Sequence, residues 1–179
     1  CDLVDYSALS ERLDPEDLRD VLRRYQDTCN KIIRRFDGYI AQYLGDGLLV
    51  YFGYPQAHED DALRAARTGL GIIEAIRHIN PNLQERLAVK LSVRIGIHTG
   101  LVVTGEVGQG VSREHLAVGE TPNIAARLQG QAAPNTVVVS ATTYKLIDSY
   151  FTCSKSETIL LKGFSEAVGV CQIEHVSTA

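Results

Sequence analysis

The chain has 179 residues and a net charge of -4, with 22 acidic residues against 18 lysines and arginines. This length suits one compact domain, and the dispersed, mainly acidic charge argues against nucleic-acid binding, which normally needs a clustered basic surface. The four cysteines lie far apart and indicate neither a zinc site nor a disulfide framework, so we expect a reducing, cytoplasmic setting.

No apolar run approaches the ~20 residues that span a bilayer, so we expect no membrane contact from this domain. The first residues are typical of a strand, which places the carboxylate of Asp2 near a strand end. Because Cys1 already falls within this strand, we expect the domain to have been excised from a larger protein. A turn at residues 5–7 then leads towards a helix.

Asp14 and Pro15 form a strong helix start, with Asp as the capping residue and Pro at the first helical position. Apolar residues recur at three- and four-residue steps to about Phe36, which predicts an amphipathic helix facing a sheet, and Gly38 ends it.

Two β-rich stretches follow, Tyr39–Leu44 and 48–52, and Gly45-Asp46-Gly47 between them predicts a tight hairpin turn. Good turn chemistry alone would explain Asp46. A second carboxylate at Asp2, on another strand end, favours the alternative that the two acids share hard divalent cations.

Residues 58–61 begin a second helix, and residues 91–98 alternate as a strand that places Arg94 on its polar face. Arg94 either lines an anion site or lies on a solvated face. Thr99-Gly100 predicts a turn into 101–104 that completes a hairpin. Residues 105–113 form a glycine-rich loop, which lacks the Lys-Ser/Thr ending of a phosphate-binding P-loop.

A short helix begins near residue 119 and places Asn123 and Arg127 on one face, where they could bind an oxyanion or simply lie at the surface. The remaining pattern predicts a strand at Thr136–Ser140, a helix at 141–148, and closing strands at 158–161 and 167–173 with Lys162 in the turn between them.

Four ordered motifs together resemble the catalytic domain of the class III nucleotidyl cyclases, in particular its bacterial and soluble adenylyl cyclase branch. The motifs are Asp2-Leu-Val-x-Tyr-Ser, Leu44-Gly-Asp46-Gly, Val93-Arg-Ile-Gly-Ile-His-Thr-Gly100 and Val118-Gly-x-Thr-x-Asn123-x-Ala-x-Arg127. The resemblance covers essentially the whole chain, residues 1–179, and implies that it is a single catalytic domain. It implies an α+β fold with a ferredoxin-like βαββαβ core, extra strands and a mainly antiparallel sheet backed by helices.

The resemblance also implies an adenylyl cyclase that converts ATP into 3',5'-cyclic AMP and pyrophosphate. Two Mg²⁺ or Mn²⁺ ions would be bound at each site by Asp2, Asp46 and the backbone carbonyl of Leu3. Each site would lie at the interface of a homodimer.

Four further positions match residues that contact the substrate in this family. Arg94 and Lys162 would bind phosphates. Asn123 would orient the ribose, and Arg127 would stabilise charge on the α-phosphate.

Two positions that would contact the base depart from the family's adenylyl pattern. Gln42 stands where a lysine is usual and can serve adenine or guanine, because an amide both donates and accepts hydrogen bonds. Leu116 stands where Asp or Thr is usual and offers only packing. ATP is favoured. The alternatives are a cyclase acting on GTP or another nucleotide, and a catalytically weak nucleotide-sensing or dimerisation domain.

Overall fold

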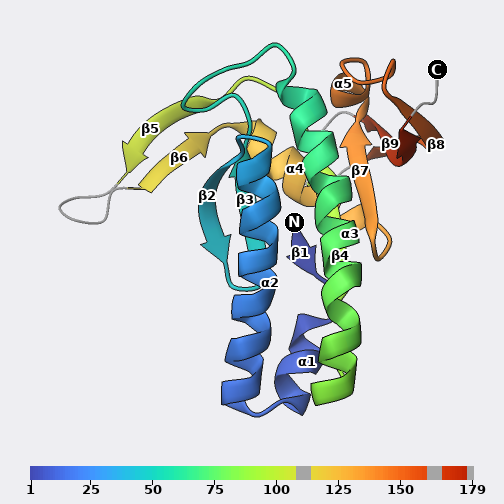
Figure 1. Ribbon diagram of the computed structural model, residues 1–179. Coiled ribbons are helices and arrows are strands. Elements are labelled where there is room, and N and C mark those ends of the chain that lie inside the picture. The colour runs from blue at the N-terminus through green and yellow to red at the C-terminus, as the bar shows by residue number, and fades with distance from the viewer. Residues whose placement is uncertain (108–113, 161–166, 177–179) are drawn as a thin grey trace.

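The computed structural model describes residues 1–107, 114–160 and 167–176, which form a sheet with helices on both faces (Figure 1). In chain order the elements are β1 (Asp2–Leu3), α1 (Tyr6–Arg12), α2 (Pro15–Arg35), β2 (Tyr39–Leu44), β3 (Gly47–Tyr51), α3 (Asp61–Leu87), β4 (Val93–Ile97), β5 (Val103–Val107), β6 (Glu114–Val118), α4 (Glu120–Gln131), β7 (Thr136–Ser140), α5 (Ala141–Tyr144), β8 (Phe151–Leu160) and β9 (Ala167–Val176).

The main sheet has the strand order β1-β4-β7-β9-β8. Within it β4 and β7 are parallel, and the other neighbouring strands are antiparallel. The β2-β3 hairpin joins the β1 edge through a reciprocal pair of backbone hydrogen bonds. Leu48 N–H donates to the Cys1 carbonyl at 2.7 Å, and Cys1 N donates to the Leu48 carbonyl at 3.0 Å. The predicted α+β class with a mainly antiparallel sheet is confirmed.

Helices α2 and α3 run side by side across one face of the sheet (Figure 1). The apolar stripe predicted for residues 14–36 becomes the buried side of α2, where four residues spaced four apart are buried. Full burial of a large aliphatic side chain contributes about 1.5–3 kcal/mol, so this stripe fixes the helix on the core. The buried residues of α2 are Val21, Tyr25, Cys29 and Ile33.

Helix α4 packs on the opposite face of the sheet, where Leu128 is fully buried together with Val138 of β7 and Val170 of β9. In Figure 1 it lies behind the plane of α2 and α3. None of the helices in the described residues combines the length and the hydropathy needed to cross a membrane.

Four parts of the fold differ from the sequence-based expectations. The stretch after β1 forms the helix α1, where we expected only a turn. The hairpin predicted to join residues 91–98 and 101–104 is wrong, because β4 is flanked by β1 and β7, whereas β5 pairs with β6. Residues 105–107 of the expected glycine-rich loop belong to β5. The final helix is shorter than expected and β8 begins earlier, at Phe151.

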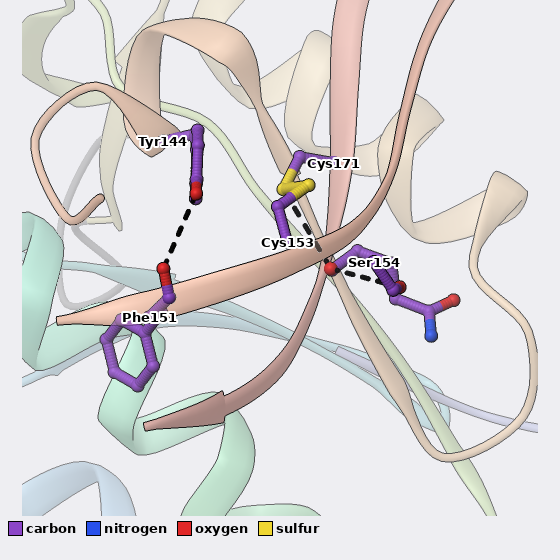
Figure 2. The surroundings of a disulfide bond; sticks show 6 residues. Tyr144, Phe151, Cys153, Ser154 and Cys171 are labelled. Carbon is purple, nitrogen blue, oxygen red and sulfur yellow. Dashed lines mark hydrogen bonds between the residues drawn. A yellow bond between two sulfur atoms is a disulfide. The ribbon is translucent and has the colours of Figure 1, made fainter. Parts of the chain in front are cut away.

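The expectation that no disulfide forms is also wrong. Cys153 of β8 and Cys171 of β9 are bonded to each other, with their Cα atoms 5.8 Å apart (Figure 2). The β8-β9 ladder contains register irregularities at Cys153, and beside the bond Ser154 Oγ donates to the Gln172 carbonyl at 3.5 Å. The cysteines are 18 positions apart in sequence, and only the strand pairing makes them neighbours.

Candidate functional site

The carboxylates of Asp2 and Asp46 are brought together by the pairing of Cys1 with Leu48. This pairing places Asp2 over the hairpin turn, where a Cβ added to Gly47 would lie 3.4 Å from Asp2 Oδ1. Gly45 adopts a φ of 68°, which lets the two-residue turn close and holds Asp46 at the hairpin tip.

The proximity of the two acids changes the ionisation of Asp2. Its pKa is raised from 3.8 to about 6, first by burial and then by a hydrogen bond and charge repulsion from the Asp46 carboxyl. The backbone N–H of Leu3 donates to Asp2 Oδ1 at 3.1 Å and opposes this shift. Two carboxylates that repel each other in a partly buried site gain from a shared proton or a bound cation.

The donor set available here suits a hard divalent cation. Among the described residues, no group of three or more His, Cys, Asp or Glu side chains could hold a metal ion. A cation beside Asp2 and Asp46 would therefore complete its shell with main-chain, water or substrate oxygens, as Mg²⁺ and Mn²⁺ commonly do. The roles of Asp2, Asp46 and the Leu3 carbonyl as ligands stay predictions.

The sheet register aligns Arg94 of β4 with Asp2 of β1. Its Nε is buried and has no hydrogen-bond partner within the described residues. A buried guanidinium N–H without a partner is costly, and an anionic ligand would satisfy it.

Asn123 and Arg127 share a face of α4, as predicted, but that face is exposed to solvent. Other residues of α4, namely Pro122, Ala125, Ala126 and Gln129, contribute to the lining of a cavity of about 570 Å³ that also includes Asp2 and Asp46. Neither Asn123 nor Arg127 is among the described residues that line this cavity. Within one copy of the chain, these two side chains are therefore exposed and do not line the cavity that holds the carboxylates.

The remaining predicted positions are only partly described. Gln42 is half-buried in β2 at a register irregularity of the hairpin. The backbone of Leu116 lies in β6 opposite Gly105, and β2 and β6 are in contact. The side chain of Leu116 and all of Lys162 lie outside the described residues, so their roles stay predictions.

Tyr25 is a residue near the site that the sequence pattern placed only in the apolar stripe. Its ring is fully buried in α2, and its hydroxyl lies 3.5 Å from Cys1 Sγ. A phenol in an otherwise apolar stripe is the signal that could have marked it, because a buried tyrosine hydroxyl usually has a polar partner.

Comparison with known proteins places these features in context. The family model described as "Adenylate and Guanylate cyclase catalytic domain" matches residues 1–174. Adenylate cyclase 1 of Rhizobium meliloti (strain 1021) is 32% identical over 129 residues, which cover 72% of this chain and 19% of that protein. The chain therefore spans about a fifth of the length of this curated relative.

Two solved structures resemble almost the whole chain. The guanylyl cyclase Cya2 matches with a TM-score of 0.95 at 30% identity, and covers 99% of this chain and 90% of its own. The adenylyl cyclase CyaB from P. aeruginosa matches with a TM-score of 0.93 at 28% identity, and covers 99% of this chain and 92% of its own.

Proposed function

Since the chain belongs to the family of adenylate and guanylate cyclase catalytic domains, we propose that it converts ATP into 3',5'-cyclic AMP and pyrophosphate at sites shared between two copies of the chain. The observation that supports this most directly is the juxtaposition of Asp2 and Asp46, which raises the pKa of Asp2. Closely placed carboxylates at a strand end suit a reaction that needs divalent cations beside a triphosphate.

In this proposal Asp2, Asp46 and the carbonyl of Leu3 hold two Mg²⁺ or Mn²⁺ ions. When bound, these ions would lower the pKa of the ribose 3'-hydroxyl and offset the charge of the triphosphate. Arg94 donates its unpartnered N–H to phosphate oxygens, supported by its alignment with Asp2. Lys162, which lies outside the described residues, would bind the β- and γ-phosphates.

Asn123 and Arg127 act on the substrate held by a second copy. Their exposure on α4 and their absence from the lining of the cavity support this assignment. Asn123 orients the ribose, and Arg127 donates to the α-phosphate as negative charge develops there during in-line displacement. A two-fold symmetric dimer would bring each pair to its partner's carboxylates and create two equivalent sites.

Guanylyl cyclase activity is the second candidate, because the chain is similar to both an adenylate cyclase and a guanylyl cyclase. Gln42 can present either a donor or an acceptor to a purine edge. Leu116 supplies no hydrogen bond, so a base would be selected more by shape and stacking than by polar contacts.

The proposed setting is the cytoplasm, within a longer parent protein. The disulfide between Cys153 and Cys171 is unusual for that compartment, where glutathione keeps thiols reduced. In the cytoplasm the pair would therefore be present as two thiols.

A single product assay tests the proposal against its alternatives. The purified protein is incubated with Mn²⁺ and each nucleoside triphosphate in turn, and the products are identified by mass spectrometry. Cyclic AMP as the main product supports the proposal, and cyclic GMP as the main product supports the second candidate. If no cyclic nucleotide forms with any base, both are rejected in favour of a catalytically weak nucleotide-sensing domain.

A further inference from the structure

One face of the β2-β3 hairpin meets the main core, and the other face turns away from it. Leu48 is buried in this core and Val50 packs against it. Successive side chains of a strand point to opposite faces, so Leu49 between them points away from the core. Leu49 is half-buried and belongs to neither of the core clusters formed by the described residues.

The hairpin register gives the side chain of Gln42 the same direction. Gln42 and Leu49 are Cα partners, and partners across an antiparallel pair direct their side chains to one face. Ile40 pairs with Val50 and packs on the core, and the register shift between Ile40 and Gln42 leaves Ala41 unpaired. This extra residue allows Ile40 to face the core while Gln42 faces away from it.

Gln42 and Leu49 are therefore direct neighbours on the outer face of the hairpin. Cross-strand partners have Cβ atoms about 4.5–5.5 Å apart, so a polar group at position 49 could reach the Gln42 amide. The Leu49 side chain has no polar atom, and the Gln42 side chain makes no hydrogen bond among the described residues. An amide has a donor end and an acceptor end, and Leu49 cannot fix which end points outward.

The two ends of the amide suit different purines. At ring nitrogen N1, adenine accepts a hydrogen bond and guanine donates one. The lysine that is usual at position 42 in adenylyl cyclases can only donate, which matches adenine. The nitrogen end of Gln42 would therefore favour ATP, and its oxygen end would favour GTP.

We propose that position 49 controls the base preference of this chain by orienting the amide of Gln42. Leu49 leaves the amide free to turn, so this pair of residues alone selects neither purine. A hydrogen-bonding side chain at position 49 would hold one end of the amide and present the other end to the base. The inference rests on the proposed function, from which it takes the contact between Gln42 and the base. Both residues belong to one hairpin, so the effect is the same whichever copy binds the phosphates.

Two substitutions of opposite hydrogen-bonding character test this proposal. The ammonium group of Leu49→Lys would donate to the Gln42 oxygen and leave the N–H₂ group for the base. The ratio of kcat/KM for ATP to kcat/KM for GTP should then rise at least about tenfold. The carboxylate of Leu49→Glu would accept from the N–H₂ group, and the same ratio should fall at least about tenfold.

The ratio is a readout that a purely structural effect does not change. ATP and GTP carry the same triphosphate, so a change in local charge or in the folded fraction affects both values of kcat/KM alike. Leu49→Met is the matched control, because its side chain is also apolar and similar in volume. It should leave the ratio within about twofold of the wild-type value.

The same substitutions in a Gln42→Leu background show whether position 49 acts through Gln42. Without the amide there is nothing to orient, so the ratio should stay within about twofold of that of the Gln42→Leu protein. A shift that persists in this background would mean that residue 49 contacts the base itself, and it would overturn the proposal.

Binding of 3'-deoxy nucleotides gives a second readout that needs no turnover, because these analogues lack the attacking hydroxyl. With Mn²⁺, the ratio of the Kd values for 3'-deoxy-ATP and 3'-deoxy-GTP should follow the same two preferences. Shifts that vanish, reverse or run in the same direction would overturn the proposal, as would failure of the wild type to bind either analogue. If no cyclic nucleotide forms, the proposed function fails, and the binding ratios still decide the role of position 49.

Discussion

Gly96 of β4 lies directly against the backbone of Gln129 in α4. A Cβ added to Gly96 would come 2.2 Å from Gln129 N and 2.4 Å from the Ala125 carbonyl oxygen. Contacts this short with backbone atoms cannot be relieved by a side-chain rotation, so a glycine is required where the helix crosses the strand. This crossing holds α4 against the sheet.

Replacement of Gly96 by alanine should therefore lower the free energy of unfolding by at least about 2 kcal/mol, because the methyl group would force α4 away from β4. The matched control is Gly130→Ala in the same helix, where nothing lies within 4 Å of the added Cβ. That change should stabilise the protein by about 0.5–1 kcal/mol through helix propensity. Urea unfolding of both variants measures the difference, and equal effects would contradict the close crossing.

Asp46→Asn should reduce cyclase activity at least about a hundredfold while leaving the fold intact, because the amide keeps the shape of the side chain but loses the charge that holds a cation. Asp20→Asn, on the exposed surface of α2, is the control and should retain full activity. Initial rates with Mn²⁺, together with circular dichroism, check this. Full activity in the Asp46 variant would exclude it as a metal ligand.

Asp2→Asn should stabilise the metal-free protein at neutral and higher pH. The folded-state pKa of Asp2 is about 6, above its ordinary value of 3.8, so ionisation of this group costs folded-state stability as pH rises from 3.8 through 6. The gain from the variant should be near zero below about pH 4 and reach about 1–2 kcal/mol above about pH 7, after allowance for solvent screening.

Urea unfolding of both proteins in EDTA, at a series of pH values, measures this gain. Added Mn²⁺ should reverse its sign, because the wild type alone would then keep both carboxylates for the ion. A gain that does not vary with pH would show that ionisation of Asp2, in its partly buried position beside Asp46, is not its cause.

Two inactive variants should restore activity when they are mixed. Asp46→Asn removes a carboxylate, and Arg127→Ala removes the exposed guanidinium of α4, so a heterodimer of the two would contain one intact site and one doubly altered site. Random exchange of subunits should give about a quarter of the wild-type rate, since half of the dimers are mixed and each has one working site of two. A mixture as inactive as its components would place the whole site within one chain.

Reduction of the Cys153–Cys171 disulfide should lower the stability of the purified protein by about 3 kcal/mol, as expected for closure of a loop of 18 residues. A Cys153→Ser variant should unfold at the same urea concentration as the reduced wild type. Thiol labelling of the denatured, non-reduced protein should modify Cys1 and Cys29 and leave the bonded pair unlabelled. Labelling of all four cysteines would contradict the bond.

The fold class and most helices could be predicted from the sequence because their signals are local. The apolar stripe of α2 and the glycine-flanked turn at Asp46 are each recognised from residues that lie close together in the sequence. The four motifs could also be identified, and the roles of Asp2, Asp46, Arg94, Asn123 and Arg127 stay predictions.

The features that could not be predicted depend on contacts between distant segments. Nothing near residues 91–104 shows that β4 lies between β1 and β7, because strand neighbours are chosen by packing of the whole sheet. The disulfide has the same origin, since the β8-β9 pairing joins cysteines that have no motif spacing. The exposure of Asn123 and Arg127 could be seen only in the structure. Helical periodicity shows that two residues share a face, but it does not show whether that face contacts the protein or solvent.

The backbone contact between Gly96 and Gln129 has a consequence for the neighbouring molecule in a dimer. Helix α4 touches β4 through backbone atoms, so any displacement of α4 at this contact would also move Arg127. In a shared site, an interior substitution at position 96 would therefore impair the reaction in trans, on the substrate held by an unaltered partner.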